Sequence, residues 1–214
     1  MHTNIYIFGD SIAFGKYDSD GGGWPQKLNY FLSKQYLSGE SEEFYIYNLS
    51  ISGDRSREIL ARFDAEMFAR KSGNTSKEVV IFAIGLNDSA YVLSQKENWT
   101  NKEDFVAGIK ELVVAAKKYA SEILFVGIYP VDGKITSPMP WDLDKTYSNE
   151  TIRQYDQMLK VAVEESGAIH IPLFDKFAVL DYKKLLHDGA HPNSAGHELI
   201  FEAVRDYLLA GKII

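Results

Sequence analysis

The chain has no cysteine among its 214 residues, and this absence excludes three kinds of chemistry together. Disulfides, thiolate metal sites and a cysteine nucleophile are not available, so packing must hold the fold. The sequence also lacks an apolar run of membrane-spanning length. It enters a predicted strand at once, without the basic segment and apolar stretch of a signal peptide. We therefore expect a cytoplasmic protein with no integral membrane association.

Positive charge is also in short supply, because 23 lysines and arginines face 30 aspartates and glutamates. The formal net charge is −7, and the lysines and arginines form no basic run. Proteins that bind nucleic acid rely on clustered basic side chains to contact the phosphates. Nucleic acid is therefore not an expected partner. The 45% hydrophobic content is that of an ordinary globular domain.

Five apolar runs rich in β-forming residues alternate along the chain with segments of helical spacing. The predicted strands are residues 5–8, 44–51, 78–84, 123–129 and 168–173. The last of the helical segments is expected to begin after Asn193 and to end near Gly211. Asn101 and Ser148 are the expected N-terminal caps of two other helices.

This alternation predicts a parallel sheet, because parallel strands need crossover connections and are covered on both faces. The expected fold class is α/β, as a three-layer α/β/α domain around a five-stranded parallel sheet. No linker, internal repeat or low-complexity segment divides the sequence. We therefore predict a single domain over residues 1–214.

Reactive side chains stand near both ends of the chain. Ser11 follows the first predicted strand, at the carboxyl end where open α/β sheets bind their ligands. Asp188 and His191 are three residues apart, so the carboxylate can orient the imidazole. A serine, a histidine and a carboxylate are the parts of a nucleophilic hydrolase. The sequence therefore predicts Ser11 as nucleophile, His191 as general base and Asp188 as its partner.

Two further loops should reach the same edge of the sheet, because they follow the second and third strands. One carries Gly53, and the other runs from Gly85 to Asp88 and includes Asn87. Acyl transfer needs donors aimed at the oxyanion of the tetrahedral intermediate. The backbone N–H of Gly53 and the side-chain amide of Asn87 are the candidates. We expect Gly85 to relieve a tight turn and Asp88 to support its neighbour.

Four short blocks, each at a strand end or before the last helix, resemble the ordered blocks of the SGNH/GDSL hydrolases. The blocks are Gly9-Asp10-Ser11, Gly53, Gly85-x-Asn87-Asp88 and Asp188-x-x-His191. The resemblance implies a flavodoxin-like fold, a Ser-His-Asp triad and an oxyanion hole completed by the Ser11 N–H. No cofactor is expected. The sequence departs from the older consensus where Ile12 replaces a leucine, a change that should not touch the chemistry.

The expected activity is that of a serine esterase working through an acyl-enzyme. Acetylated sugars and short acyl esters are favoured over phospholipids, because the sequence has no apparent membrane-binding surface. An acyltransferase, a thioesterase or a lysophospholipase with the same triad is an alternative, as is a flavodoxin-like binding module with a vestigial triad. The sequence does not indicate an oligomeric state, and the expected partner is a small-molecule ester.

Two stretches, residues 89–101 and 131–147, are longer than connections in a parallel sheet require. Long loops at the catalytic edge often shape access to the substrate. Four large side chains in these loops are therefore candidates for the acyl or alcohol pocket: Tyr91, Trp99, Met139 and Trp141. The alternative is that these side chains only pack the loops down.

Three other features have structural interpretations. His187 and His191 are four apart, as in a zinc helix, but Gly189 and Pro192 oppose a helix there, so no metal site is predicted. We expect His187 and His197 at the surface or in loops. The Gly21-Gly22-Gly23 run lacks the residues of a phosphate-binding loop and is expected to be a flexible turn.

Asp10 adjoins the nucleophile, which makes it a further candidate for catalysis. Neighbouring side chains at a strand end point in different directions. A structural hydrogen bond is therefore the expected role of Asp10, and it is left out of the triad.

Overall fold

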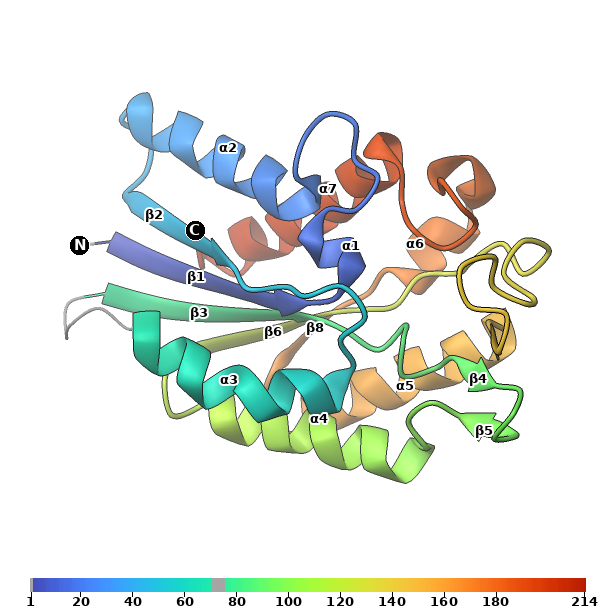
Figure 1. Ribbon diagram of the computed structural model, residues 1–214. Helices are drawn as coiled ribbons and strands as arrows, with labels where there is room; N and C mark the ends of the chain where they lie inside the picture. The colour runs from blue at the N-terminus through green and yellow to red at the C-terminus, as the bar shows by residue number, and fades with distance from the viewer. Residues whose placement is uncertain (1, 71–75) are drawn as a thin grey trace.

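Five parallel strands form the centre of the computed structural model, which describes residues 2–70 and 76–214 (Figure 1). The strands pair in the order β2-β1-β3-β6-β8, which is the 2-1-3-4-5 order of flavodoxin-like sheets. The predicted α/β fold and its five-stranded parallel sheet are therefore confirmed. The bounds are β1 His2–Gly9, β2 Glu43–Asn48, β3 Ser76–Ala83, β6 Glu122–Val126 and β8 Ile169–Ile171.

The central strands are apolar along their length because both faces of the sheet are covered. In β1 and β3, residues 5–8 and 79–82 are fully buried on either side, the pattern of a parallel sheet between two helical layers. Strand β2 ends at Asn48, three residues before the predicted end. The chain beyond it stays against β1, since the N–H groups of Leu49 and Ile51 donate to carbonyls of that strand.

Helices cover both faces of the sheet, as Figure 1 shows. One layer contains α1 (Ser11–Phe14), α2 (Gly23–Leu37) and α7 (Ser194–Ala210), and the other contains α3 (Ser56–Arg70), α4 (Lys102–Ala116) and α5 (Asn149–Glu165). Two short turns of helix, α6 (Phe174–Ala178) and η1 (Tyr182–Leu185), complete the described helices. Across residues 2–70 and 76–214, no helix combines the length and apolar character needed to cross a membrane.

The three helices α4, α5 and α7 begin where the sequence places them. The Asn101 side chain accepts the Asp104 N–H at 2.8 Å and caps α4, and Asn193 likewise caps α7, which ends before Gly211. Ser148 occupies the N-cap position of α5, but its side chain makes no capping hydrogen bond. The side chain at the N-cap position therefore makes a capping hydrogen bond in α4 and α7 but not in α5.

A second, three-stranded antiparallel sheet was not predicted. It consists of β4 (Tyr91–Val92), β5 (Glu97–Asn98) and β7 (Lys145–Thr146), in the order β5-β4-β7. Strands of two residues are too short to show an alternating pattern in the sequence. This sheet joins the two long loops to each other beyond the carboxyl ends of the central strands (Figure 1).

The expectation that His197 lies at the surface is wrong, because this residue is fully buried within α7. Its Nδ1 accepts the Trp24 N–H, and its Nε2 lies 3.1 Å from the Lys16 carbonyl, to which it donates. Burial lowers the pKa of His197 and favours this neutral form. His197 thus fastens the segment after α1 to α7, whereas His187 is exposed, as expected.

Aromatic packing at the middle of the sheet provides a test of the core. Phe82 of β3 contacts Phe8, Phe63 and Phe125, with ring centroids 4.6–5.8 Å apart. Phe82→Ala should lower the free energy of unfolding by about 3–5 kcal/mol, because it leaves a cavity in a closed core. The control is Phe68→Ala on α3, where the side chain is 83% exposed. Urea unfolding that showed equal losses in the two variants would contradict this account.

Candidate active site

Ser11 is the first residue of α1, and only Asp10 separates it from the end of β1. The Asp10 carboxyl caps this short helix by accepting the Ile12 N–H at 2.9 Å, which fixes the sharp turn from strand to helix. A side chain at Gly9 would lie 2.6 Å from the Ala13 side chain, so only glycine allows the helix to fold back this closely. The turn leaves Ser11 at the edge of the sheet, 8% exposed.

Ser11, His191 and Asp188 form a continuous chain of hydrogen bonds. The Ser11 Oγ lies 2.8 Å from the His191 Nε2, although the two residues are 180 positions apart. The His191 Nδ1 lies 2.8 Å from the Asp188 Oδ2. Since a carboxylate can only accept, Nδ1 carries the proton and Nε2 accepts from the serine hydroxyl. The structure therefore brings together the three residues predicted at opposite ends of the chain.

The loop that bears Asp188 holds its carboxylate in the ionised form. Burial opposes ionisation, but hydrogen bonds from the His191 ring, the His191 N–H and the Ala190 N–H outweigh it and lower the Asp188 pKa to about 2. The Tyr129 hydroxyl donates to the Ala190 carbonyl at 2.9 Å and supports the loop from the core. As expected, this stretch is not helical, since Leu186 bridges to Pro192. Asp188 is thus charged across the neutral pH range.

A cleft of about 260 Å³ opens beside Ser11, and the candidate oxyanion donors line it. Gly53 has a φ of +90°, a left-handed conformation that glycine adopts without strain. This loop is exposed and follows the extension of β2. The cleft is lined by Asp10, Ser11, Ile12, Lys16, Ser52, Gly53, Leu86, Asn87, Trp141, Tyr147, Ala190 and His191.

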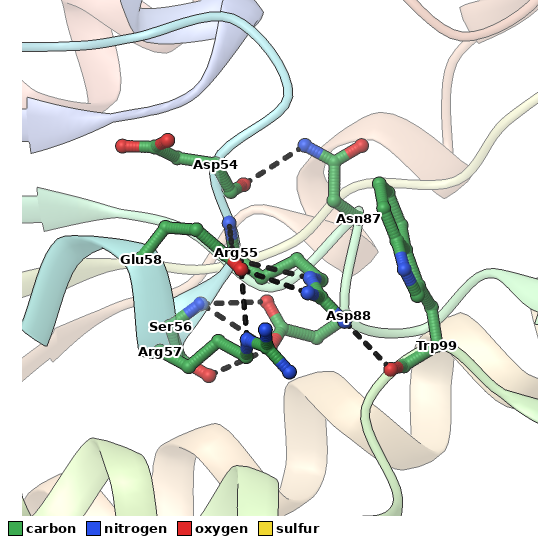
Figure 2. Close-up of polar contacts among 8 residues, drawn as sticks. All are labelled: Asp54, Arg55, Ser56, Arg57, Glu58, Asn87, Asp88 and Trp99. Carbon is green, nitrogen blue, oxygen red and sulfur yellow. Dashed lines mark hydrogen bonds and ion pairs between the residues drawn. The ribbon is translucent and has the colours of Figure 1, made fainter. Parts of the chain in front are cut away.

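The Asn87 amide connects the loops that follow three strands. Its Nδ2 donates to the Asp54 carbonyl at 3.0 Å and to the Asp10 Oδ2 at 3.3 Å. Figure 2 shows the amide pointing toward the Asp54 backbone, beside the turn that leads into α3. The residue predicted to stabilise an oxyanion is therefore held between the Gly53 loop and the start of α1.

Below Asn87, buried charges tie the Gly53 loop to the Asn87 loop. The Asp88 carboxyl accepts the Ser56 hydroxyl at 2.6 Å and the Ser56 N–H, which caps α3 (Figure 2). Burial raises the Asp88 pKa against these hydrogen bonds. The Arg55 guanidinium donates twice to Glu58 and once to the Trp99 carbonyl. These bonds fit the supporting role expected of Asp88 and fix the spacing of the two loops.

Asp10 makes structural hydrogen bonds rather than joining the triad. Its carboxyl contacts the Ile12 N–H and the Asn87 amide, and it has no bond to His191 among the described hydrogen bonds. Burial raises the Asp10 pKa to about 7, against the effect of the Ile12 N–H, and nearby carboxylates of Asp88 and Asp54 raise it further. Asp10 therefore titrates close to neutrality in the folded protein.

The structure separates the four side chains proposed to line the pocket. Trp141 lines the cleft at Ser11, with its ring centroid 5.3 Å from that of His191. Trp99 lies between the cations of Arg55 and Lys145 and borders a different cleft. Met139 is buried in its loop, and Tyr91 forms part of β4. Neither of these two lines the cleft at Ser11.

Three residues at the cleft were not singled out from the sequence. Lys16 and Tyr147 line it, and the Tyr17 ring lies 5.5 Å from the His191 ring and stacks on His187 at 4.1 Å. Tyr17 has a φ of +65°, which is unusual for a non-glycine residue. The only signal in the sequence for Lys16 and Tyr17 is that they follow the nucleophile closely, and the sequence gives no such signal for Tyr147.

Asp10 gives a pH-dependent stability that can be measured. Its pKa rises from 3.8 to about 7 on folding, so the folded state binds more protons in that range and the free energy of unfolding falls as pH rises. Asp10→Asn cannot ionise and keeps an acceptor for the Ile12 N–H. The variant also loses the contact with Asn87, which lowers its free energy of unfolding by the same amount at every pH. Urea unfolding from pH 4 to 8 should show the wild type losing stability relative to the variant, and parallel curves would contradict the assignment.

Two esterases are similar in sequence to large parts of this chain. An acetylxylan esterase of Geobacillus stearothermophilus is 26% identical over 74% of this chain and 69% of its own. A multidomain esterase of Ruminococcus flavefaciens is 24% identical over 96% of this chain, which spans 29% of that protein's length.

Solved structures share the fold of this chain. The acetylxylan esterase Axe2 of Geobacillus stearothermophilus has a TM-score of 0.72 at 20% identity, covering 94% of this chain and 92% of that one. LAE5, an α/β hydrolase enzyme from the metagenome of Lake Arreo, has a TM-score of 0.73 at 21% identity, covering 97% and 94%. The model of the GDSL-like lipase/acylhydrolase family matches residues 7–199. The chain therefore belongs to this family and is a carboxylic ester hydrolase.

Proposed function

We propose that Ser11, His191 and Asp188 are the catalytic triad of a serine esterase that cleaves short acyl esters of carbohydrates. The observation that carries this proposal is the unbroken series of hydrogen bonds from the Ser11 Oγ through the His191 ring to the Asp188 carboxylate, with both bonds at 2.8 Å. This geometry is the one in which a neutral imidazole can remove the serine proton as the hydroxyl attacks.

In the first half of the reaction, the Ser11 Oγ bonds to the ester carbonyl carbon and the proton moves to the His191 Nε2. The carbonyl oxygen becomes an oxyanion, which the N–H groups of Ser11 and Gly53 and the Asn87 amide stabilise. Asp188, with a pKa of about 2, stays charged and stabilises the imidazolium. His191 then gives its proton to the alcohol oxygen as the bond to the acyl carbon breaks.

In the second half, water takes the place of the alcohol. His191 removes a proton from the water as its oxygen attacks the acyl-enzyme carbonyl, and the same donors stabilise the second oxyanion. When this intermediate collapses, the proton returns to the Ser11 Oγ and the carboxylic acid leaves. The enzyme regains its starting state without a cofactor.

The surroundings of His191 support a carbohydrate as the alcohol part of the ester. Because His191 must protonate the leaving oxygen, side chains that flank its ring face the alcohol rather than the acyl group. Trp141 and Tyr17 flank it, and they are 43% and 42% exposed. Partly exposed aromatic rings offer flat apolar faces with polar edges, which suit a sugar ring. The strained backbone of Tyr17 is consistent with a functional position.

The acyl part is proposed to be small. Polar groups, including Lys16, Ser52 and Asn87, make up much of the cleft wall, and the apolar side chains of Ile12 and Leu86 are largely buried. A cleft lined in this way offers little continuous apolar surface to a long acyl chain. The relatives named as acetylxylan esterases support an acetyl group on a sugar as the substrate class.

The triad is tested by labelling and by hydrolysis of p-nitrophenyl acetate. Wild-type protein should react with a fluorophosphonate and hydrolyse the ester, whereas Ser11→Ala should do neither, because the acyl-enzyme cannot form. Asn87→Ala should keep the labelling site and lower kcat about 10²–10³-fold through loss of one oxyanion donor. A folded wild-type sample that did not label would overturn the esterase proposal and favour a binding module.

The alcohol subsite is tested with substrates that share the acetyl group. Trp141→Ala and Tyr17→Ala should each lower kcat/KM for acetylated xylose by roughly fivefold, as expected for the loss of an aromatic contact of about 1 kcal/mol, and should leave kcat/KM for ethyl acetate nearly unchanged. Tyr30→Ala on α2, 70% exposed and away from the cleft, is the control. A change in acetyl-over-butyryl preference without a change toward the sugar would place these rings at the acyl side.

A further inference from the structure

An asparagine amide has two ends of similar size, and only one can stabilise an oxyanion. The NH₂ end donates hydrogen bonds, whereas the oxygen end would repel the negative charge. If Asn87 serves the oxyanion, as proposed above, something must keep its Nδ2 toward the reacting centre through each turnover.

Three groups meet the two ends of the Asn87 amide. The Asp54 carbonyl and the Asp10 carboxyl lie against the Nδ2, at 3.0 Å and 3.3 Å. The Tyr147 hydroxyl donates to the Oδ1 at 3.3 Å. A reversed amide would turn its oxygen toward the Asp54 carbonyl, which can only accept. The Asp54 carbonyl thus selects the orientation, and the Tyr147 hydroxyl stabilises it from the other side by donating to the Oδ1.

We propose that Tyr147 is a positioning residue that orients the Asn87 amide for stabilisation of the oxyanion. This inference rests on the proposed role of Asn87 and extends it to a residue outside the catalytic blocks. Tyr147 lines the same cleft as Ser11 and Asn87, so its hydroxyl reaches the amide from the loop side of the site. It acts through Asn87 and does not itself contact the reacting atoms.

The hydroxyl of Tyr147 is suited to this task because it always carries its proton. Tyr147 is 5% exposed. Burial raises its pKa well above the usual range, and the nearby carboxylates of Asp10, Asp88 and Asp188 raise it further. The phenol is therefore a donor at every pH at which the esterase can be assayed.

The second sheet fixes Tyr147 in place. Tyr147 follows β7, which pairs with β4, and its N–H donates to the Thr136 carbonyl at 3.1 Å. The next residue, Ser148, occupies the N-cap position of α5. The side chain is thus held between a strand and a helix, and its hydroxyl approaches Asn87 from a direction that the central sheet does not supply.

The two bonds at the Nδ2 show which N–H can serve the oxyanion. The contact with the Asp54 carbonyl is the shorter one and joins Asn87 to the backbone beside Gly53. The contact with Asp10 is long, so its N–H can be exchanged for an oxyanion at little cost. The Tyr147 hydroxyl keeps the amide from turning while this exchange takes place.

The test is Tyr147→Phe, which removes the hydroxyl and keeps the ring. We expect kcat for p-nitrophenyl acetate to fall about tenfold with KM nearly unchanged, because the lost bond matters when the oxyanion forms. Binding of phenylboronic acid, whose tetrahedral adduct with Ser11 mimics the intermediate, should weaken by a similar factor. The control is Tyr155→Phe in α5, where the lost hydroxyl donates to the Thr100 carbonyl away from Asn87 and kcat should not change.

A double-mutant cycle separates positioning from packing. In an Asn87→Ala background, Tyr147→Phe should have almost no further effect on kcat, because the group that it orients is gone. If the two losses multiply, Tyr147 acts by another route and the proposal fails. If Asn87→Ala leaves kcat unchanged while Ser11→Ala abolishes activity, the oxyanion role of Asn87 fails, and the role of Tyr147 with it. A loss of activity matched by a lower melting temperature in Tyr147→Phe would also count against positioning.

Discussion

The hydrogen bond between the Ser11 Oγ and the His191 Nε2 depends on nearly every element of the fold. It joins the end of the first strand to a loop before the last helix, across 180 residues. Such a contact can form only if the intervening strands run parallel, so that each returns to the same edge of the sheet. The aromatic core and the helices on both faces of the sheet hold the strands in this arrangement. The hydrogen bonds among Ser11, His191 and Asp188 form because the arrangement brings the three residues together.

Buried charged groups beneath the cleft fix the positions of the loops at this edge of the sheet. Asp88 and Ser56, Asp54 and Arg62, and Arg55 and Glu58 are joined by hydrogen bonds or ion pairs that link the starts and ends of several elements. A buried carboxylate without such donors would cost several kcal/mol, so each pair fixes the backbone that carries it. For Glu58, burial opposes ionisation, but the bonds to Arg55 outweigh it and lower the pKa. These bonds therefore restrain the loops that bear Gly53 and Asn87.

The sequence was sufficient to predict the sheet and the proposed catalytic residues, because both depend on local patterns. Apolar runs identify buried strands, and Ser11, Gly53 and Asn87 each follow one of them. The loop residues are different. Tyr147 and Trp141 lie in a segment whose two-residue strand has no readable period, and its position is set by contacts with distant loops. His197 was misplaced for a related reason, since a polar residue in a helix is buried only when a neighbouring segment supplies partners for both ring nitrogens.

The central sheet and the added loops also contribute different parts of the site. The segments after the strands supply Ser11 and the proposed oxyanion donors, and the loop before α7 supplies His191; this is the machinery that any ester requires. The added loops supply Trp141 beside the proposed leaving group and the Tyr147 hydroxyl on the oxyanion donor. Both residues lie in the segment that the second sheet holds in place. A change in that segment should therefore alter both the selectivity for the alcohol part of the ester and the catalytic rate. If both proposed roles hold, substrate choice and catalytic rate are therefore coupled through the loop that bears Trp141 and Tyr147.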